Sequence, residues 1–304
     1  MEHYLLISNT IDNKINNNIL DYLSTKLKDV IIQDKNFRVL SPRKAYELQL
    51  QNKDINLELQ TFIVNLLKKN QIDCNFIKVT KDRKKKLLLA DMDSTIIKEE
   101  SLDELARQIG KEKEVVKITN EAMSGHIDFK KALLERVAIL RGQPAEILEK
   151  LKKNITVNDG AKELIKTMRN NNSVTVLVSG GFTFLTEHLK KMLGFDYTHA
   201  NSLETSQNNS NDVFLTGRVK DPILDKQAKG WYLDQYVIKN KLNYEDTVCV
   251  GDGANDIEMI KKADFGVSFN GKKSLDKEAN IHFKNTNLLG LLYAQGYSDK
   301  QIIS

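Results

Sequence analysis

Three apolar runs, each followed at once by polar or glycine residues, constrain the fold of this 304-residue chain more than any other feature. They are LLLA at 87–90, VTVLV at 174–178 and TVCV at 247–250. Apolar runs without alternation suit strands that are covered on both faces, as in a parallel sheet. Helical patterns at 163–168, 184–192 and 256–262 lie between and after them. We therefore predict an α/β fold with a doubly wound, Rossmann-like parallel sheet, in which ligands sit at the carboxyl ends of the strands.

The spacing of the runs predicts an inserted segment. Asp91 and Ser179 are 88 positions apart, whereas a βαβ unit takes roughly 30 residues. Residues 99–155 carry their own helical patterns, and Ser101 with Glu104 suggests a capping box that opens the first helix. We interpret this segment as a helical cap over a catalytic core made of residues 81–98 and 156–304. The tract SQNNSND at 206–212 resembles the tip of a hairpin or loop.

The first 80 residues indicate a small, separate α/β domain, which loosely resembles regulatory-type α/β extensions of other proteins. Short strands are expected at 4–8, 37–40 and 76–79, and helices at 15–27 and 55–68. The run KDRKKK at 81–86 could touch an anionic partner, but a solvated linker is the simpler interpretation.

Net charge, apolar runs and cysteine spacing argue against several kinds of partner. The net charge of +5 on 46 basic and 41 acidic residues does not by itself imply nucleic acid. No apolar run approaches the roughly 18 residues that span a bilayer, and the start of the chain shows no secretory pattern, so we expect a cytoplasmic protein without a membrane partner. Cys74 and Cys249 share no metal-ligand spacing and are expected to be buried thiols.

The acidic residues after the strands suggest a metal site. At about 4 Å and an effective dielectric near 20, two carboxylates such as Asp91 and Asp93 repel by roughly 4 kcal/mol, so one takes a proton or a cation lies between them. Asp252 and Asp256 follow another apolar run, and such oxygen ligands suit Mg²⁺. Taken alone, the pair of Asp91 and Asp93 is as compatible with a turn or helix cap as with catalysis.

Four segments together resemble the motifs of the haloacid dehalogenase superfamily: DMDST at 91–95, VSGG at 178–181, Lys229, and GDGAND at 251–256. From about 87 to 285 the sequence is also similar to the phosphoserine phosphatase family, including EAMSGHIDFKKALLERV at 121–137 and VSGGFTFL at 178–185. The resemblance implies hydrolysis of O-phospho-L-serine to L-serine and phosphate, the last step of serine biosynthesis. It implies a small-molecule substrate, and a homodimer is one possible assembly.

The same resemblance implies a mechanism. Asp91 would be the nucleophile that forms an aspartyl-phosphate, and Asp93 would protonate the departing serine oxygen and then deprotonate the attacking water. Mg²⁺ would be bound by the side chains of Asp91 and Asp252 and by the backbone carbonyl of Asp93.

Further residues are implied to handle the phosphoryl group. Ser179, Gly180 and Lys229 would hold its oxygens, where a hydroxyl, a backbone N–H and a cation stabilise the transition state. Asn255 would contact the phosphoryl group or the water, and Asp256 would orient Lys229 or metal-bound waters. Taken singly, SGG is a weak signal and a lysine is usually a surface residue.

Substrate choice is implied to come from the cap. Glu100 would receive the serine ammonium and Arg136 its carboxylate, with Met123 and Phe129 closing the pocket and Gly125 acting as a hinge. Two alternatives stay open. The chain could act on another small phosphomonoester as a related phosphatase or phosphotransferase, or it could be an inactive ligand-binding sensor that kept the fold.

Overall fold

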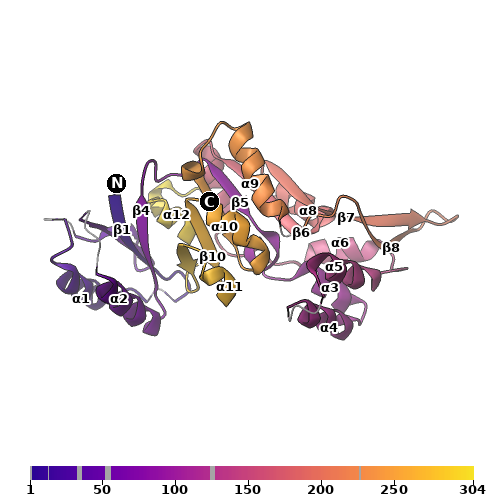
Figure 1. Cartoon of the computed structure of the whole chain (residues 1–304), viewed down its shortest axis with the longest axis horizontal. Helices are drawn as coiled ribbons and strands as arrows, with labels where there is room; N and C mark the ends of the chain where they lie inside the picture. Colours follow the sequence, from indigo (N-terminus) through magenta and orange to yellow (C-terminus); the bar gives the residue numbers. More distant parts are fainter. Residues whose placement is uncertain (1, 13, 33–35, 52–55, 124–126, 226) are drawn as a thin grey trace.

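The structure is a computed structural model that describes residues 2–12, 14–32, 36–51, 56–123, 127–225 and 227–304, without the side chains of residues 120, 122, 123 and 129. The molecule is elongated (Figure 1). An N-terminal α/β unit forms one end, the larger sheet lies in the middle, and a helical segment with a long hairpin forms the other end. No helix among these residues is long and apolar enough to cross a membrane.

The central sheet confirms the predicted fold class. Among the described residues it has seven strands in the order β11-β10-β9-β5-β6-β7-β8. The strands are β5 (Leu87–Ala90), β6 (Val174–Phe182), β7 (Tyr197–Gln207), β8 (Val213–Lys220), β9 (Thr247–Gly251), β10 (Phe265–Phe269) and β11 (Ile281–Phe283). All neighbours are parallel except β7 and β8. β8 pairs antiparallel with β7 across the tract at 206–212, where a hairpin or loop tip was predicted, because so short a tract can form a hairpin but no crossover.

Helices cover both faces of this sheet. On β5, Leu87 and Leu89 belong to one apolar cluster with α9 (Ala228–Lys239) and α10 (Ile257–Lys262). Leu88 and Ala90 belong to another, with α7 (Ala161–Asn170), α8 (Thr183–Leu193) and α12 (Gly290–Ala294). Burial on both faces explains why the run has no polar alternation. Each fully buried leucine contributes about 1.5–3 kcal/mol, and β5 is thereby fixed at the centre of the sheet.

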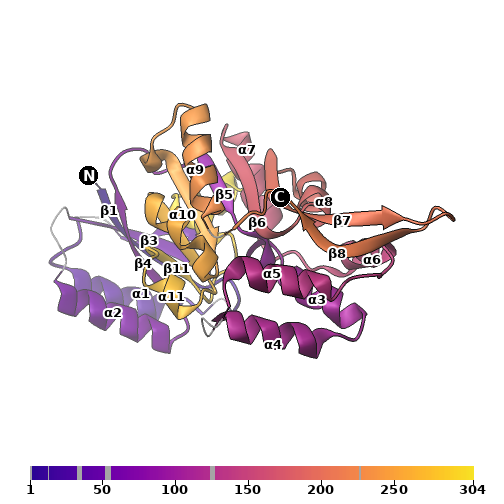
Figure 2. The ribbon, with the colours of Figure 1, turned by 45° about the vertical axis from the view of Figure 1, so that its right-hand side comes forward.

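A helical segment follows β5 in the chain: α3 (Ser101–Gln108), α4 (Glu112–Met123), α5 (Phe129–Ala138) and α6 (Glu146–Asn154). The β7–β8 hairpin extends beyond the sheet and lies along this segment, with β8 beside α5 (Figure 2). Backbone hydrogen bonds join them, including Gly142 N to Leu215 O at 2.8 Å and Leu215 N to Gln143 O at 2.9 Å. The hairpin therefore ties the helical segment to the core sheet.

The predicted capping box of α3 is wrong. Glu100, and not Ser101, occupies the N-cap position, and no side chain caps the helix there. Ser101 is the first helical residue, and its hydroxyl donates instead to Asp93. A short hydroxyl side chain bonds the nearest strong acceptor, and in this fold the acceptor comes from the preceding strand end.

The N-terminal unit contains β1 (Glu2–Ser8), α1 (Asn17–Leu27), β2 (Arg38–Ser41), β3 (Ala45–Leu50), α2 (Leu57–Lys69) and β4 (Asp73–Val79). Its described strands form an antiparallel sheet in the order β2-β3-β1-β4. α1 and α2 cover one face (Figure 1). Leu6 and Ile77 join the apolar cluster of the core, which includes Tyr293 of α12. Side-chain hydrogen bonds add to this contact, since the Asp73 carboxylate accepts from Lys284 N at 3.0 Å and from Asn285 N at 2.9 Å.

The basic run at 81–86 is not the solvated linker that we expected. Lys85 is 2% exposed, and its ammonium lies 2.5 Å from Asp264 Oδ2. The Arg83 guanidinium lies 4.1 Å from the centre of the Tyr4 ring and pairs with Glu47 at 2.7 Å. Arg83 thus lies at the junction between the N-terminal unit and the core, whereas Lys85 is buried against the core. Lys86 and the other exposed members remain in solvent.

Candidate active site

Asp91 directly follows β5, and a tight turn then reverses the chain. Its backbone N–H donates to Val250 O at 3.0 Å, which continues the pairing of β5 with β9. The turn η1 (Met92–Ile96) contains Ser94 in the left-handed region, with φ of 54°. One oxygen of the Asp91 carboxylate, Oδ1, accepts a hydrogen bond from Met92 N at 2.8 Å. The backbone therefore sets the orientation of this carboxylate.

A buried lysine, Lys229, lies between the carboxylates of Asp91 and Asp256. Lys229, in the first turn of α9, places Nζ 2.7 Å from Asp91 Oδ1 and 2.5 Å from Asp256 Oδ1. Burial alone would lower the pKa of Lys229, but Asp256 and Asp91 outweigh it and the pKa is raised. Lys229 is therefore a permanent cation at this point, as charge-assisted contacts of this length require.

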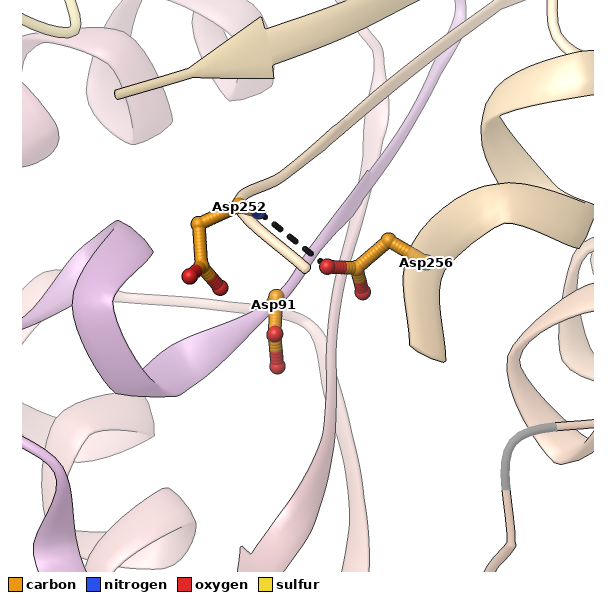
Figure 3. A group of neighbouring side chains, drawn as sticks. All are labelled: Asp91, Asp252 and Asp256. Carbon is orange, nitrogen blue, oxygen red and sulfur yellow. Dashed lines mark hydrogen bonds between the residues drawn. The ribbon is translucent and has the colours of Figure 1, made fainter. Parts of the chain in front are cut away.

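Asp91, Asp252 and Asp256 form an acidic cluster that could bind a metal ion, with one oxygen of each within 4.8 Å of the others (Figure 3). Burial, followed by repulsion from Asp256, raises the pKa of Asp91 well above its usual range and that of Asp252 to about 6. Buried carboxylates with this excess of negative charge fit a hard cation, for which oxygen is the preferred ligand.

The three acids of the cluster are not equally available to a metal. Asp256 accepts from Asp252 N at 3.1 Å and Gly253 N at 3.0 Å through one oxygen, and its other oxygen contacts Lys229. Figure 3 shows its hydrogen bond to the backbone of Asp252. Both of its oxygens are therefore occupied by donors. Asp91 and Asp252 keep more free ligand capacity than Asp256.

Asp93 lies on the same turn and is anchored by α3. Its two oxygens accept hydrogen bonds from Ser101 N at 3.1 Å and from Ser101 Oγ at 3.0 Å. Burial, followed by repulsion from Glu100, raises the pKa of Asp93 to about 7. Such a carboxyl group can both give and take a proton near neutral pH.

The glycines after β6 make room for Asp93. A Cβ on Gly181 would lie 2.9 Å from Asp93 Oδ2 and 2.8 Å from the Met92 side chain, so no larger residue fits without displacing them. Ser179 is buried, and its hydroxyl accepts from Gly181 N at 2.8 Å. The strand end VSGG thus brings a hydroxyl and close-approaching backbone up to the acidic turn.

A cavity of about 1250 Å³ lies between this strand edge and the helical segment. Glu100 lines it from the N-cap of α3, and its carboxylate accepts from Ser94 Oγ at 2.7 Å. Arg136 lines it from α5, and Nε donates to Ala132 O at 3.3 Å. Burial lowers the pKa of Arg136, against the opposing influence of nearby carboxylates, so the guanidinium remains charged.

The structure brings most of the residues selected from the sequence into this one cavity. Those that line it are Asp91, Asp93, Glu100, Arg136, Ser179, Gly180, Asp252 and Asn255. Lys229 and Asp256 are buried beside Asp91. Gly125 and the side chains of Met123 and Phe129 lie outside the described residues.

Sequence reasoning missed other residues of the lining, among them Asp103, Thr119, Lys272 and Lys273. A signal for Lys272 and Lys273 was present, because FGVSF at 265–269 is a further apolar run and NGKK follows it directly. Asp103 lies one helical turn after Glu100, on the same side of α3. Nothing in the local sequence distinguishes Thr119 from other polar residues of α4.

Comparisons with known proteins agree with this geometry. The model of the haloacid dehalogenase-like hydrolase family matches residues 88–261. Phosphoserine phosphatase of Methanocaldococcus jannaschii is 43% identical over 211 residues, which cover 69% of this chain and 98% of that protein. Phosphoserine phosphatase of Archaeoglobus fulgidus is 42% identical over 212 residues, which cover 70% of this chain and 60% of that longer protein.

A solved structure covers nearly the whole chain. The crystal structure of a HAD family hydrolase from Salmonella enterica superposes with a TM-score of 0.83 at 25% identity, covering 96% of this chain and 98% of that one. The similarity therefore includes most of the N-terminal unit as well as the central sheet.

Proposed function

The chain belongs to the haloacid dehalogenase-like hydrolase family, and from this premise we propose that it hydrolyses O-phospho-L-serine to L-serine and phosphate through an aspartyl-phosphate. One observation carries the proposal. A single cavity is lined by Asp91 and Asp93 of the core, by Glu100 at the N-cap of α3 and by Arg136 of α5. The names of the relatives from M. jannaschii and A. fulgidus support the same substrate.

In the first step, Asp91 attacks phosphorus and the bond from phosphorus to the serine oxygen breaks. Asp93 gives its proton to that departing oxygen, so serine leaves as the neutral alcohol. Asp91 is suited to this role because Met92 N and Lys229 fix its carboxylate at the cavity wall. Asp93 is suited to its role because Ser101 fixes both of its oxygens.

In the second step, Asp93 takes a proton from water, and the water oxygen attacks the aspartyl-phosphate. The bond between phosphorus and Asp91 breaks, so phosphate leaves and both carboxyl groups return to their initial states. Ser179 and the N–H of Gly180 are proposed to hold the phosphoryl oxygens, together with the ammonium of Lys229. Asn255 also lines the cavity and is proposed to contact the phosphoryl group or the water. Asp256 holds Lys229 in place.

The resident metal is proposed to be Mg²⁺, held by Asp91 and Asp252 with the backbone carbonyl of Asp93. The all-oxygen donor set and the uncompensated negative charge support this choice. When bound, Mg²⁺ supplies the positive charge that allows a phosphate dianion to approach the carboxylates.

Selectivity for phosphoserine is proposed to arise from the cap. The terminal nitrogens of Arg136 have no hydrogen-bond partner among the described residues, so they can bind a carboxylate in bidentate fashion. Glu100 would receive the ammonium, and Met123 and Phe129 are proposed to close the pocket. The enzyme is proposed to act in the cytoplasm, in the last step of serine biosynthesis.

Phosphate release from phosphoserine tests the proposal, with Asp91→Asn as the blank and with EDTA in a parallel reaction. We expect release that requires both Asp91 and the metal. Arg136→Ala should lower phosphoserine turnover much more than turnover of an aryl phosphate, and an equal loss on both would remove the argument for amino-acid selectivity. A panel of other small phosphomonoesters tests the alternative substrates. Absence of release from all of them would favour the sensor alternative.

A further inference from the structure

Lys272 lies at the carboxyl end of β10, immediately before α11 (Lys273–Asp276), and lines the cavity. Its backbone N–H donates to Asp252 O at 2.8 Å. Its ammonium lies 3.6 Å from Asp252 Oδ2. The Lys272 side chain is 56% exposed, whereas the Asp252 side chain is 11% exposed. An exposed cation therefore lies beside one of the two proposed side-chain ligands of the metal.

Hydrogen bonds hold the backbone of Lys272, whereas its side chain is exposed and has only the long contact with Asp252 among the described residues. Its carbonyl accepts from Leu275 N at 2.9 Å and Asp276 N at 3.0 Å, which closes the turn into α11. The Asp276 carboxylate is in turn held by Ser268 Oγ at 2.6 Å and Lys284 Nζ at 2.7 Å. The position of the Lys272 Cα is thus determined, while the four-carbon side chain can direct its ammonium to different partners.

The contact with Asp252 is loose compared with the other cation near Asp91. Lys229 is 1% exposed and lies 2.7 Å and 2.5 Å from two carboxylates. At 3.6 Å and in solvent, the pair of Lys272 and Asp252 is longer than a charge-assisted hydrogen bond and is weakened by water. Lys272 can therefore leave its partner at small cost, and Lys229 cannot.

A divalent cation on Asp252 would repel the ammonium beside it, because like charges a few ångströms apart repel. The displaced ammonium would remain in the cavity, which also receives the phosphoryl group. We propose that Lys272 exchanges partners: it pairs with Asp252 before the metal binds, and with a phosphoryl oxygen afterwards. The second half of this exchange rests on the proposed function, and the first half does not.

Lys272→Met tests the exchange because the two halves of the exchange predict opposite changes in affinity, one for Mg²⁺ and one for phosphate. Binding of Mg²⁺ alone, measured by titration calorimetry, should become about 3- to 10-fold tighter, since Asp252 loses a competing cation. Binding of inorganic phosphate in saturating Mg²⁺ should become about 3- to 10-fold weaker, since the anion loses a partner. Lys272→Arg should resemble the wild type in both measurements.

Lys273→Met is the matched control, because Lys273 also lines the cavity but, unlike Lys272, forms no ion pair among the described residues. It should change Mg²⁺ affinity by less than about 2-fold. Unchanged or weaker Mg²⁺ binding by Lys272→Met would overturn the inference, as would unchanged phosphate binding. If the wild type releases no phosphate from phosphoserine while Lys272→Met still binds Mg²⁺ more tightly, the proposed substrate fails and the pairing with Asp252 stands.

Discussion

Replacement of Lys229 by methionine tests the electrostatic interpretation of the site. Lys229 is 1% exposed, and its ammonium lies 2.7 Å from Asp91 and 2.5 Å from Asp256. Methionine has a similar length and fits a buried position, but it carries no charge. Lys229→Met therefore leaves the cluster of Asp91, Asp252 and Asp256 without its buried cation.

The expected loss of stability follows from the distances. Oxygens of the three acids lie within 4.8 Å of one another, and at an effective dielectric of 20 two charges at that distance repel by about 3.5 kcal/mol. Loss of one partner from a buried ion pair costs about 3–5 kcal/mol. We expect Lys229→Met to lower the free energy of unfolding by about 3–5 kcal/mol.

Urea unfolding in the presence of EDTA measures this loss without a contribution from bound metal. Asp256→Asn in the same chain provides the control for charge. Asparagine can still accept from Asp252 N and Gly253 N, but it removes one of the repelling charges. The double variant should regain about 2 kcal/mol over Lys229→Met alone. If the double variant is no more stable than the single one, repulsion between the carboxylates does not explain the loss.

Three further predictions concern other parts of the molecule. Gly181→Ala should lower kcat about 100-fold in steady-state assays, because the added Cβ would lie 2.9 Å from Asp93 Oδ2 and push that carboxylate out of position. A near-normal kcat would contradict this prediction. Asp73→Ala should lower the free energy of unfolding by about 2–3 kcal/mol, because backbone donors at the domain junction lose their acceptor, while kcat stays unchanged. Calorimetric titration should show that Asp252→Asn abolishes Mg²⁺ binding and that Asp256→Asn weakens it only about 10-fold. Equal losses of affinity would argue against Asp252 as a metal ligand and Asp256 as a residue that only holds Lys229.

The catalytic sheet could be predicted because its signals are local. Each of the runs at 87–90, 174–178 and 247–250 carries its own polar ending, and the parallel arrangement brings those endings to one edge. The identity of Lys229 came from resemblance to a family, and its contacts did not follow from spacing. Lys229 meets Asp91 only because α9 packs against one face of the sheet over β5, the central strand that Asp91 follows.

Strand β3 was missed because its pattern depends on distant partners. AYELQL at 45–50 contains Glu47, which is 2% exposed and would ordinarily argue against a buried strand. Arg38 of β2 and Arg83 of the basic run pair with this carboxylate at 3.1 Å and 2.7 Å. The same pairing explains why the basic run is not a solvated linker. Neither feature could be recognised without the other, because each compensates the burial of the other's charge.

Three aspartates near Asp91 show how the donors around a carboxylate can give identical side chains different roles. Asp256 receives two backbone N–H groups and an ammonium, so it holds Lys229. Asp93 is held by Ser101 at both oxygens and keeps its position at the mouth of the turn. Within the described part of the chain, the Asp252 carboxylate has only the loose contact with Lys272, so it retains capacity for a metal. Since these donors come from strand ends and helix starts, the fold itself determines which aspartate anchors Lys229, which is proposed to transfer protons and which is proposed to bind the cation.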